Sequence, residues 1–188
     1  MDPQTLKKII EAAMLAAGKP LTLERMVTLF PEDQQPHRDA VRAALEAIAT
    51  DCETRGIELR ELASGFRFQV KQDMAPWVAR LWEERAPRYS RAILETLALI
   101  AYRQPITRAE IEDIRGVAVS THIVKTLMDR EWVRIVGHRD VPGRPALYGT
   151  TREFLDYFNL KSLEDMPSLS ELRNITDIDF KPDFPLAS

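Results

Sequence analysis

Apolar residues recur at helical spacing in two segments of this chain, and the two segments share one layout. The first covers residues 6–17 and leads into a turn at Pro20, whereas the second starts at Ile93 and leads into a turn at Pro105. Each copy continues with two more helix patterns, a pair of short alternating patterns and a further amphipathic helix. Helix-turn-helix followed by a small hairpin is the order of a winged helix. The pattern therefore predicts a mainly α fold with small β wings, built as two tandem winged-helix domains.

The composition changes between the two copies and again after the second. Residues 83–90 are rich in charge and contain Pro87, which a helix interior does not tolerate. Beyond Asn159 the regular apolar spacing stops. We therefore expect an N-terminal winged-helix domain over residues 1–85, a C-terminal one over 86–160, and a tail over 161–188 that is partly disordered or orders on a partner.

A stripe of large apolar residues follows the first hairpin pattern. Asp73 is predicted to cap a fourth helix there, with the stripe formed by Met74, Trp77, Val78, Leu81 and Trp82. Because tryptophan is seldom fully buried, we expect Trp77 and Trp82 to expose ring edges. These two edges are our candidates for a homodimer interface.

Local signals define the second copy more sharply. Thr107 and Glu110 form a T-x-x-E capping box, and Ser120 is a good cap for the third helix. Thr150 with Glu153 predicts the start of the last helix in the same way. Pro142-Gly143 in the loop of the second wing predicts a type II turn, because glycine adopts the positive φ that its third position needs.

The composition gives no support to catalysis. Cys52 is the only cysteine, and His37, His122 and His138 lie far apart in the sequence. No phosphate-binding, hydrolase or metalloprotease motif occurs. We therefore expect no catalytic residues, no cofactor and no metal. The absence of a long apolar run and of a signal-peptide pattern predicts a cytoplasmic protein that binds no membrane.

Several polar residues of the second copy are not explained by folding alone and are candidates for a binding surface. Arg139 and Arg144 in the wing loop could contact phosphates or the carboxylates of a protein partner. For Arg144 and Tyr148 a structural role and a binding role stay equally open. At the end of the first helix of this copy, Tyr102, Arg103 and Gln104 are further candidates for a partner surface.

Charge does not favour tight DNA binding. Residues 1–85 carry 12 Lys or Arg and 14 Asp or Glu, and residues 86–159 carry 11 and 9. The third helix of the second copy carries Lys125 and Arg130 against Asp129, with Glu131 next. A dedicated nucleic-acid reader needs a larger basic surplus where it meets phosphates. A winged-helix DNA-binding transcription regulator nevertheless stays our alternative hypothesis, since the fold alone does not reject it.

Two sequence stretches resemble a known family. They are LETLALIAYRQPITRAEIEDIRGV, residues 94–117, and GRPALYGTT, residues 143–151. Both are similar to the signature of bacterial segregation and condensation protein B. The order of elements agrees with that family from about Thr5 to Leu172.

The resemblance implies a non-enzymatic, nucleoid-associated subunit of the complex formed by the structural-maintenance-of-chromosomes (SMC) ATPase and its kleisin. It implies a homodimer joined mainly through the first domains. It further implies binding to the central region of the kleisin, segregation and condensation protein A, and through it to the ATPase, with DNA contact at most weak or indirect. The implied role is chromosome condensation and partition during cell division. Together with the residues above and Arg115, the candidate partner-binding set is Tyr102, Arg103, Gln104, Arg115, Arg139, Arg144 and Tyr148.

Overall fold

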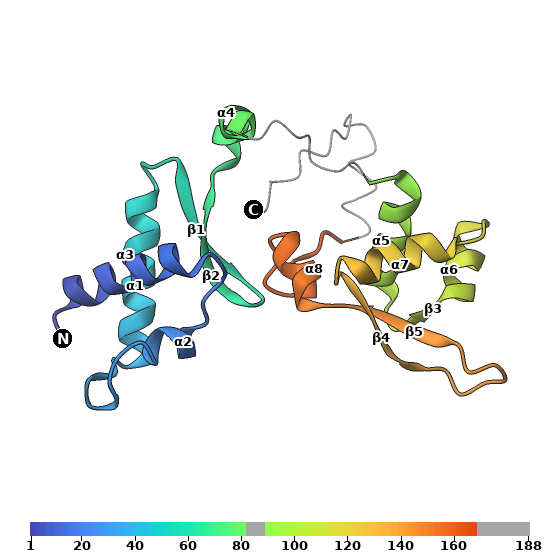
Figure 1. Ribbon diagram of the computed structural model, residues 1–188, viewed down its shortest axis with the longest axis horizontal. Coiled ribbons are helices and arrows are strands. Elements are labelled where there is room, and N and C mark those ends of the chain that lie inside the picture. Colours follow the sequence, from blue (N-terminus) through green and yellow to red (C-terminus); the bar gives the residue numbers. More distant parts are fainter. Residues whose placement is uncertain (82–88, 169–188) are drawn as a thin grey trace. The chain divides into compact units, whose positions relative to one another are not determined.

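The computed structural model describes residues 1–81 and 89–168. Contacts divide the described residues into two compact units, the first within Met1–Arg85 and the second within Ala86–Glu164. Each unit has a set of helices followed by a small antiparallel hairpin (Figure 1). This repeated order confirms the predicted fold class, which is mainly α with small β wings in two tandem winged-helix units.

The first unit places three helices before its wing. Its helices and strands are α1 (Pro3–Ala17), α2 (Leu23–Val27), α3 (Arg38–Cys52), β1 (Ile57–Leu62), β2 (Gly65–Val70) and α4 (Ala75–Val78). Short 3-10 turns cover Glu32–Gln34, Gln72–Met74 and Ala79–Leu81. Strand β1 pairs with β2, and Leu21 bridges to Phe66 on the other side of β2.

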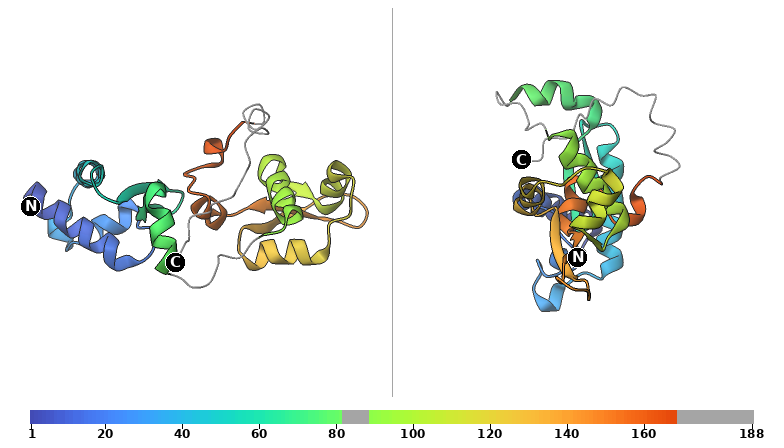
Figure 2. Two further views of the ribbon diagram at one scale, coloured as in Figure 1. Left: turned by 90° about the horizontal axis from the view of Figure 1, so that it is seen from above. Right: turned by 90° about the vertical axis from the view of Figure 1, so that its right-hand side faces the viewer.

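The core of the first unit lies where α1 and α3 cross. The two helices meet at a steep angle (Figures 1 and 2), with the apolar face of each turned inward. Ile10, Met26, Val41 and Ile48 are at most 1% exposed. These residues fall at the helical spacing that the sequence showed, so the apolar pattern and the packing agree.

The predicted fourth helix is wrong in its length and its cap. Helix α4 has only four residues, and Asp73 belongs to a 3-10 turn before it and does not cap it. Trp77 is 65% exposed and Leu81 76% exposed. A helix of one turn has few backbone hydrogen bonds of its own, and here Trp77 faces solvent while Val78 is half-buried. Trp82 lies outside the described residues.

The second unit repeats the arrangement with a longer wing. Its elements are α5 (Arg91–Arg103), β3 (Ile106–Thr107), α6 (Arg108–Arg115), α7 (Thr121–Asp129), β4 (Val133–His138), β5 (Ala146–Thr150) and α8 (Arg152–Tyr157). A 3-10 turn covers Leu163–Asp165. The three strands form one antiparallel sheet in the order β3-β5-β4. In Figure 1 the β4–β5 loop projects beyond α6 and β3.

Side-chain caps fix the helix starts of the second unit. The hydroxyls of Ser90, Thr107 and Ser120 accept hydrogen bonds at the starts of α5, α6 and α7, and the Thr107–Glu110 capping box is confirmed. Thr150 does not cap the last helix. Thr150 is still part of β5, and Thr151 caps α8 instead.

An aromatic cluster surrounds Trp132, the residue before β4. Trp132 is 2% exposed, and its ring lies 5.0 Å from Tyr89, 4.6 Å from Tyr157 and 5.6 Å from Phe158, measured between centroids. Rings in this range attract one another beyond the area they bury. The cluster therefore joins the segment before α5, the start of β4 and the end of α8.

Gly65 gives a test of the first wing. Its φ is +129°, and a Cβ there would lie 2.3 Å from the Leu21 carbonyl oxygen. Gly65→Ala should therefore cost at least about 2 kcal/mol of unfolding free energy. Gly56→Ala is the control, because the nearest atom to its added Cβ would be Met74 Cγ at 3.4 Å. Urea unfolding of both variants tests this expectation, and equal midpoints would contradict it.

Candidate functional site

The two motif stretches of the second unit meet through one side chain. The Thr150 N–H donates to Gln104 Oε1 at 2.7 Å. Gln104 Nε2 donates to the Ala101 carbonyl at 3.2 Å and lies 2.9 Å from Thr150 Oγ1. The amide of Gln104 thus joins the end of α5 to the end of β5, 46 residues later in the chain. Gln104 was predicted for a partner surface, and the structure shows its polar atoms used within the unit.

Gly149 makes room for this junction. A Cβ at residue 149 would lie 2.9 Å from Val136 Cγ1 and 3.0 Å from Gln104 Oε1. A larger residue would push the Gln104 amide away from β5 or displace β4. The second glycine of the GRPALYGTT stretch, Gly149, therefore has a packing reason, namely the close approach of α5, β4 and β5.

A second junction ties the wing to α6. Glu110 Oε2 accepts from the Thr107 N–H at 2.8 Å and from the Thr107 hydroxyl at 2.9 Å. Arg139, at the start of the wing loop, lies 2.8 Å from Glu110 Oε1 through its Nη2. The hydrogen bonds from Thr107, and then the Arg139 charge, hold the pKa of Glu110 below its usual range. Arg139 therefore orients the wing.

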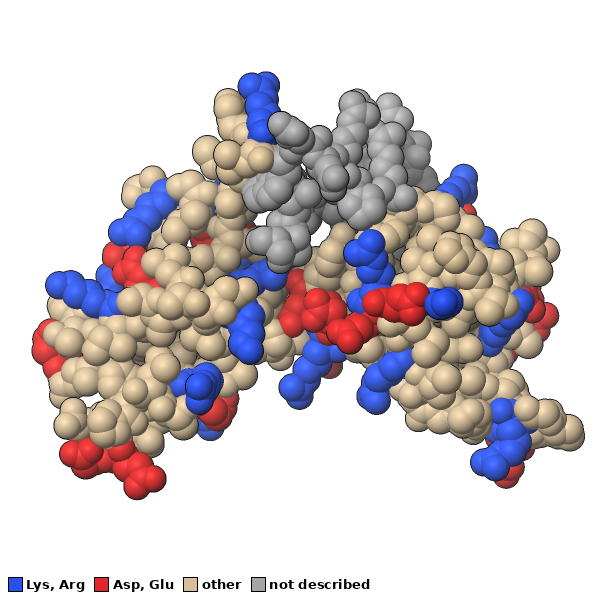
Figure 3. All heavy atoms as spheres, in the orientation of Figure 1, with Lys and Arg blue, Asp and Glu red and all other residues tan. Residues whose placement is uncertain are grey.

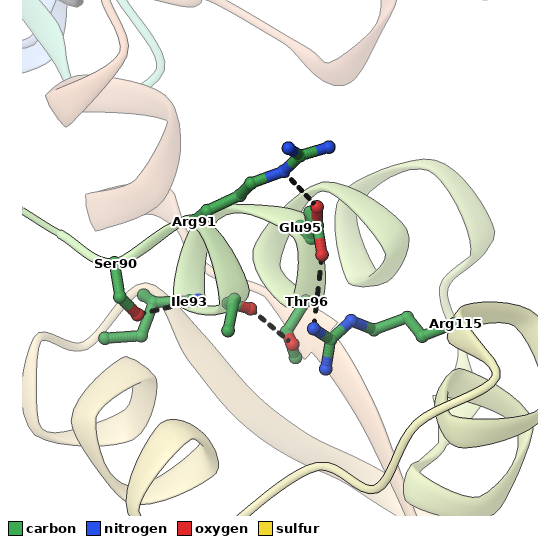
Figure 4. A network of polar contacts seen from close by, with 7 residues as sticks. Ser90, Arg91, Ile93, Glu95, Thr96 and Arg115 are labelled. Carbon is green, nitrogen blue, oxygen red and sulfur yellow. Dashed lines mark hydrogen bonds and ion pairs between the residues drawn. The ribbon is translucent and has the colours of Figure 1, made fainter.

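Arg115 is also used inside the unit. Its side chain is 9% exposed and lies 3.1 Å from Glu95, which Arg91 approaches at 2.7 Å (Figure 4). Hydrogen bonds from Arg91 first and from Arg115 second lower the pKa of Glu95. Beside them Thr96 is fully buried and donates its hydroxyl hydrogen to the Ala92 carbonyl. Arg115 thus braces α6 against α5.

The wing loop contains the turn that the sequence predicted. The Arg144 N–H donates to the Val141 carbonyl at 2.9 Å, and Gly143 between them has φ +84°. Arg144 itself has φ +39°, a conformation that is uncommon for a residue with a Cβ. Its side chain is exposed and forms no ion pair within the part of the chain that the structure describes.

The remaining candidates differ in exposure. Arg103 is exposed at the end of α5, and Tyr102 beside it is half-buried. Tyr148 is half-buried on β5, where it pairs with Ile106 on one side and Ile135 on the other. Gln104 is therefore bonded to Thr150 at the end of β5, Tyr148 lies two residues earlier on the same strand, and Arg139 is paired with Glu110 of α6. Arg115 is separate from them, against α5.

Sequence reasoning missed the exposed apolar residues of β4. Ile135 and Val136 are each 43% exposed, although they are adjacent in a strand. A register shift between Ile135 and Gly137 marks a β-bulge there. The signal was present as two successive apolar residues before a glycine, where an exposed strand would normally alternate.

The surface charge does not gather into a DNA-binding patch on the visible face. Figure 3 shows Lys and Arg side chains interspersed with Asp and Glu side chains. Directly after α7, the guanidinium carbon of Arg130 lies 5.5 Å from the centre of the Tyr89 ring, so its charge supports the aromatic cluster. Among residues 1–81 and 89–168, no cluster of three metal-ligating side chains occurs, and no helix is long and apolar enough to cross a membrane.

The fold and the wing of the second unit define a class, the tandem winged-helix proteins. Comparison with known proteins identifies the family within this class. The chain belongs to the family of the segregation and condensation complex subunit ScpB, whose family model matches residues 8–169. The match covers both units, so the family resemblance of the two motif stretches is confirmed.

Two individual relatives support the same family assignment. "Segregation and condensation protein B homolog" of Coxiella burnetii is 54% identical over 92% of this chain and 83% of the relative. Segregation and condensation protein B of Syntrophotalea carbinolica is 48% identical over 94% and 88%. The crystal structure of ScpB from Mycobacterium tuberculosis is 34% identical, with a TM-score of 0.40 over 85% of this chain and 98% of that chain. A dimer of an ScpB N-terminal domain complexed with an ScpA peptide is 30% identical, with a TM-score of 0.38 over 42% and 96%.

The Gln104 junction yields a prediction. Gln104→Ala leaves the Thr150 N–H without its acceptor, which should cost about 1–3 kcal/mol. Hydrogen exchange of the Thr150 amide should accelerate accordingly. Arg103→Ala, at the exposed neighbouring position, should change stability by less than about 0.5 kcal/mol. Unchanged Thr150 exchange in the Gln104 variant would show that the junction does not hold β5.

The Glu110 junction predicts a pH dependence. Because the folded protein lowers the pKa of Glu110, the ionised form stabilises the fold near neutral pH, and this stabilisation is lost as pH falls through the lowered pKa. Arg139→Gln should raise the titration midpoint of the Glu110 carboxyl, followed by NMR. Arg134→Gln is the control, since Arg134 is exposed on β4. Equal Glu110 midpoints in the unmodified chain, Arg139→Gln and Arg134→Gln would show that Arg139 does not contribute to the lowered pKa of Glu110.

Proposed function

We propose that this chain is a non-catalytic, nucleoid-associated subunit of an SMC–kleisin complex. In this proposal it forms a homodimer and binds the central region of the kleisin ScpA. It thereby connects to the SMC ATPase and supports chromosome condensation and partition during cell division. The observation that carries the proposal is the family match over residues 8–169, which includes both winged-helix units.

The proposal assigns different tasks to the two units. The first unit, residues 1–85, supplies the dimer contacts, and the exposed side chain of Trp77 supports this assignment. The second unit, residues 86–160, holds the kleisin. The exposed Arg144 and the half-buried Tyr148 belong to its wing, and both motif stretches of the family lie in this unit.

The second unit supports binding better than chemistry. Its half-buried and paired polar groups, Gln104, Glu110 and Arg115, connect its own helices and strands. Outside these junctions the wing offers exposed apolar and cationic side chains on a strand and loop that the junctions orient. Such an arrangement recognises another polypeptide through shape and charge.

Light scattering and kleisin capture test the proposal on the full chain. The expected results are a dimer mass and retention of the central kleisin segment. Trp77→Ala should shift the mass toward the monomer. Arg144→Glu and Tyr148→Ala should each weaken kleisin capture by about tenfold, the effect of losing one good interface contact.

Matched variants separate specific effects from general ones. Leu15→Ala removes another exposed apolar side chain, 63% exposed on α1, and should leave the dimer intact. Arg152→Glu reverses an exposed charge on α8 and should leave capture unchanged. A monomeric chain that retains no kleisin would refute the proposed function. Full capture by the Arg144 and Tyr148 variants would refute the assignment of the kleisin to the second unit.

A further inference from the structure

Strand β4 is the outer strand of the second unit's sheet, and its hydrogen bonds define which backbone groups face outward. The Thr151 N–H donates to the Trp132 carbonyl at 3.2 Å, whereas the Thr150 N–H turns the other way, to Gln104. Val133 and Thr150 are therefore a non-hydrogen-bonded pair. Because such pairs alternate along an antiparallel ladder, Ile135 and Tyr148 are another.

The N–H and C=O of Val133 and Ile135 consequently point away from β5, but Val133 is only 2% exposed, so Ile135 is the residue of this pair that presents them at the surface. Among the described residues, no backbone hydrogen bond connects Ile135 to any segment outside the β4–β5 ladder. The Ile135 side chain is 43% exposed at the same place. An outer strand with unpaired backbone groups and an apolar surface is a template for a strand from another chain.

The first unit provides an internal comparison. Strand β1 has the same outer position relative to β2 that β4 has relative to β5. Charged residues interrupt β1 at Glu58, Arg60 and Glu61, and Arg60 lies 3.1 Å from Glu58. Charges of this kind protect an outer strand from pairing. Among residues 134–137 of β4, with the sequence Arg-Ile-Val-Gly, Arg134 is the only charged residue.

We propose that β4 binds an extended segment of the kleisin as an added strand, paired at Ile135 and placed against the exposed side chains of Ile135 and Val136. This inference rests on the proposed function and identifies where the partner binds. The β-bulge after Ile135 ends the regular ladder, so the added strand is short.

Charge defines the chemistry of the segment. The β4–β5 wing, residues 133–150, carries Arg134, Arg139 and Arg144 against Asp140, and Arg139 is already paired with Glu110. Arg134 and Arg144 are exposed and have no ion pair among the described residues. A segment with apolar residues flanked by Asp or Glu complements this edge.

Two measurements on the full chain test the added strand. Ile135→Lys places a charge on the edge and should weaken kleisin capture by about tenfold or more. Ile114→Lys is the matched control, because Ile114 is 52% exposed on α6, which packs against β3 and β5. Kleisin capture by the Ile114→Lys variant should stay within about threefold of that by the unmodified chain.

Hydrogen exchange reports the backbone pairing directly. When the central kleisin segment is added, the Ile135 amide should exchange at least about tenfold more slowly, whereas the Arg134 amide, which faces β5, should not change. Capture by the unmodified chain without Ile135 protection and without loss in Ile135→Lys would overturn the added strand while leaving the proposed function intact. Absence of capture by the unmodified chain would refute the proposed function itself. Ile135 protection that depends on protein concentration without kleisin would assign the edge to a second copy and overturn the inference.

Discussion

The second unit depends on the side-chain amide of Gln104. The sheet's short first strand, β3, has only two residues, so it does not extend far enough to pair with the Thr150 N–H. Gln104 supplies the missing acceptor at 2.7 Å from a side chain. This closes α5 onto β5, and Gly149 provides the space for it. Because Thr150 then faces Gln104, the hydrogen-bond register of β4 is fixed, and so is the set of groups on its outer edge.

The same constraint explains why the two units differ although they repeat one architecture. In the first unit the strand before α2 is a bridge at Leu21, whose N–H and C=O both pair with Phe66 over Gly65. Backbone alone closes that sheet. In the second unit, side chains close the structure in place of backbone pairs. Gln104 accepts a hydrogen bond from the Thr150 N–H, and Glu110 pairs with Arg139 at the start of the wing loop. The long wing is thereby held in one orientation by polar contacts at its base.

Local sequence signals predicted local structure well. The Thr107–Glu110 box, the Ser120 cap and the Pro142-Gly143 turn involve residues at most three apart, so spacing alone reveals them. The predicted fourth helix failed because an apolar stripe does not by itself provide backbone hydrogen bonds or a buried surface. The roles of Gln104, Arg115 and Arg139 depend on contacts 20 to 46 residues away, which no pattern in a single sequence specifies.

These distant contacts also explain why the family stretches are poor guides to individual binding residues. Gln104, Arg115 and Gly149 all lie in the motif stretches, yet each acts on the chain's own elements. A side chain that is paired and buried contributes to recognition by orienting what is exposed. Here the exposed features are Ile135, Val136 and Arg144, of which only Arg144 lies within a motif stretch. The motif residues Gln104 and Gly149 therefore hold β5 against α5 and β4, and Arg115 holds α6 against α5.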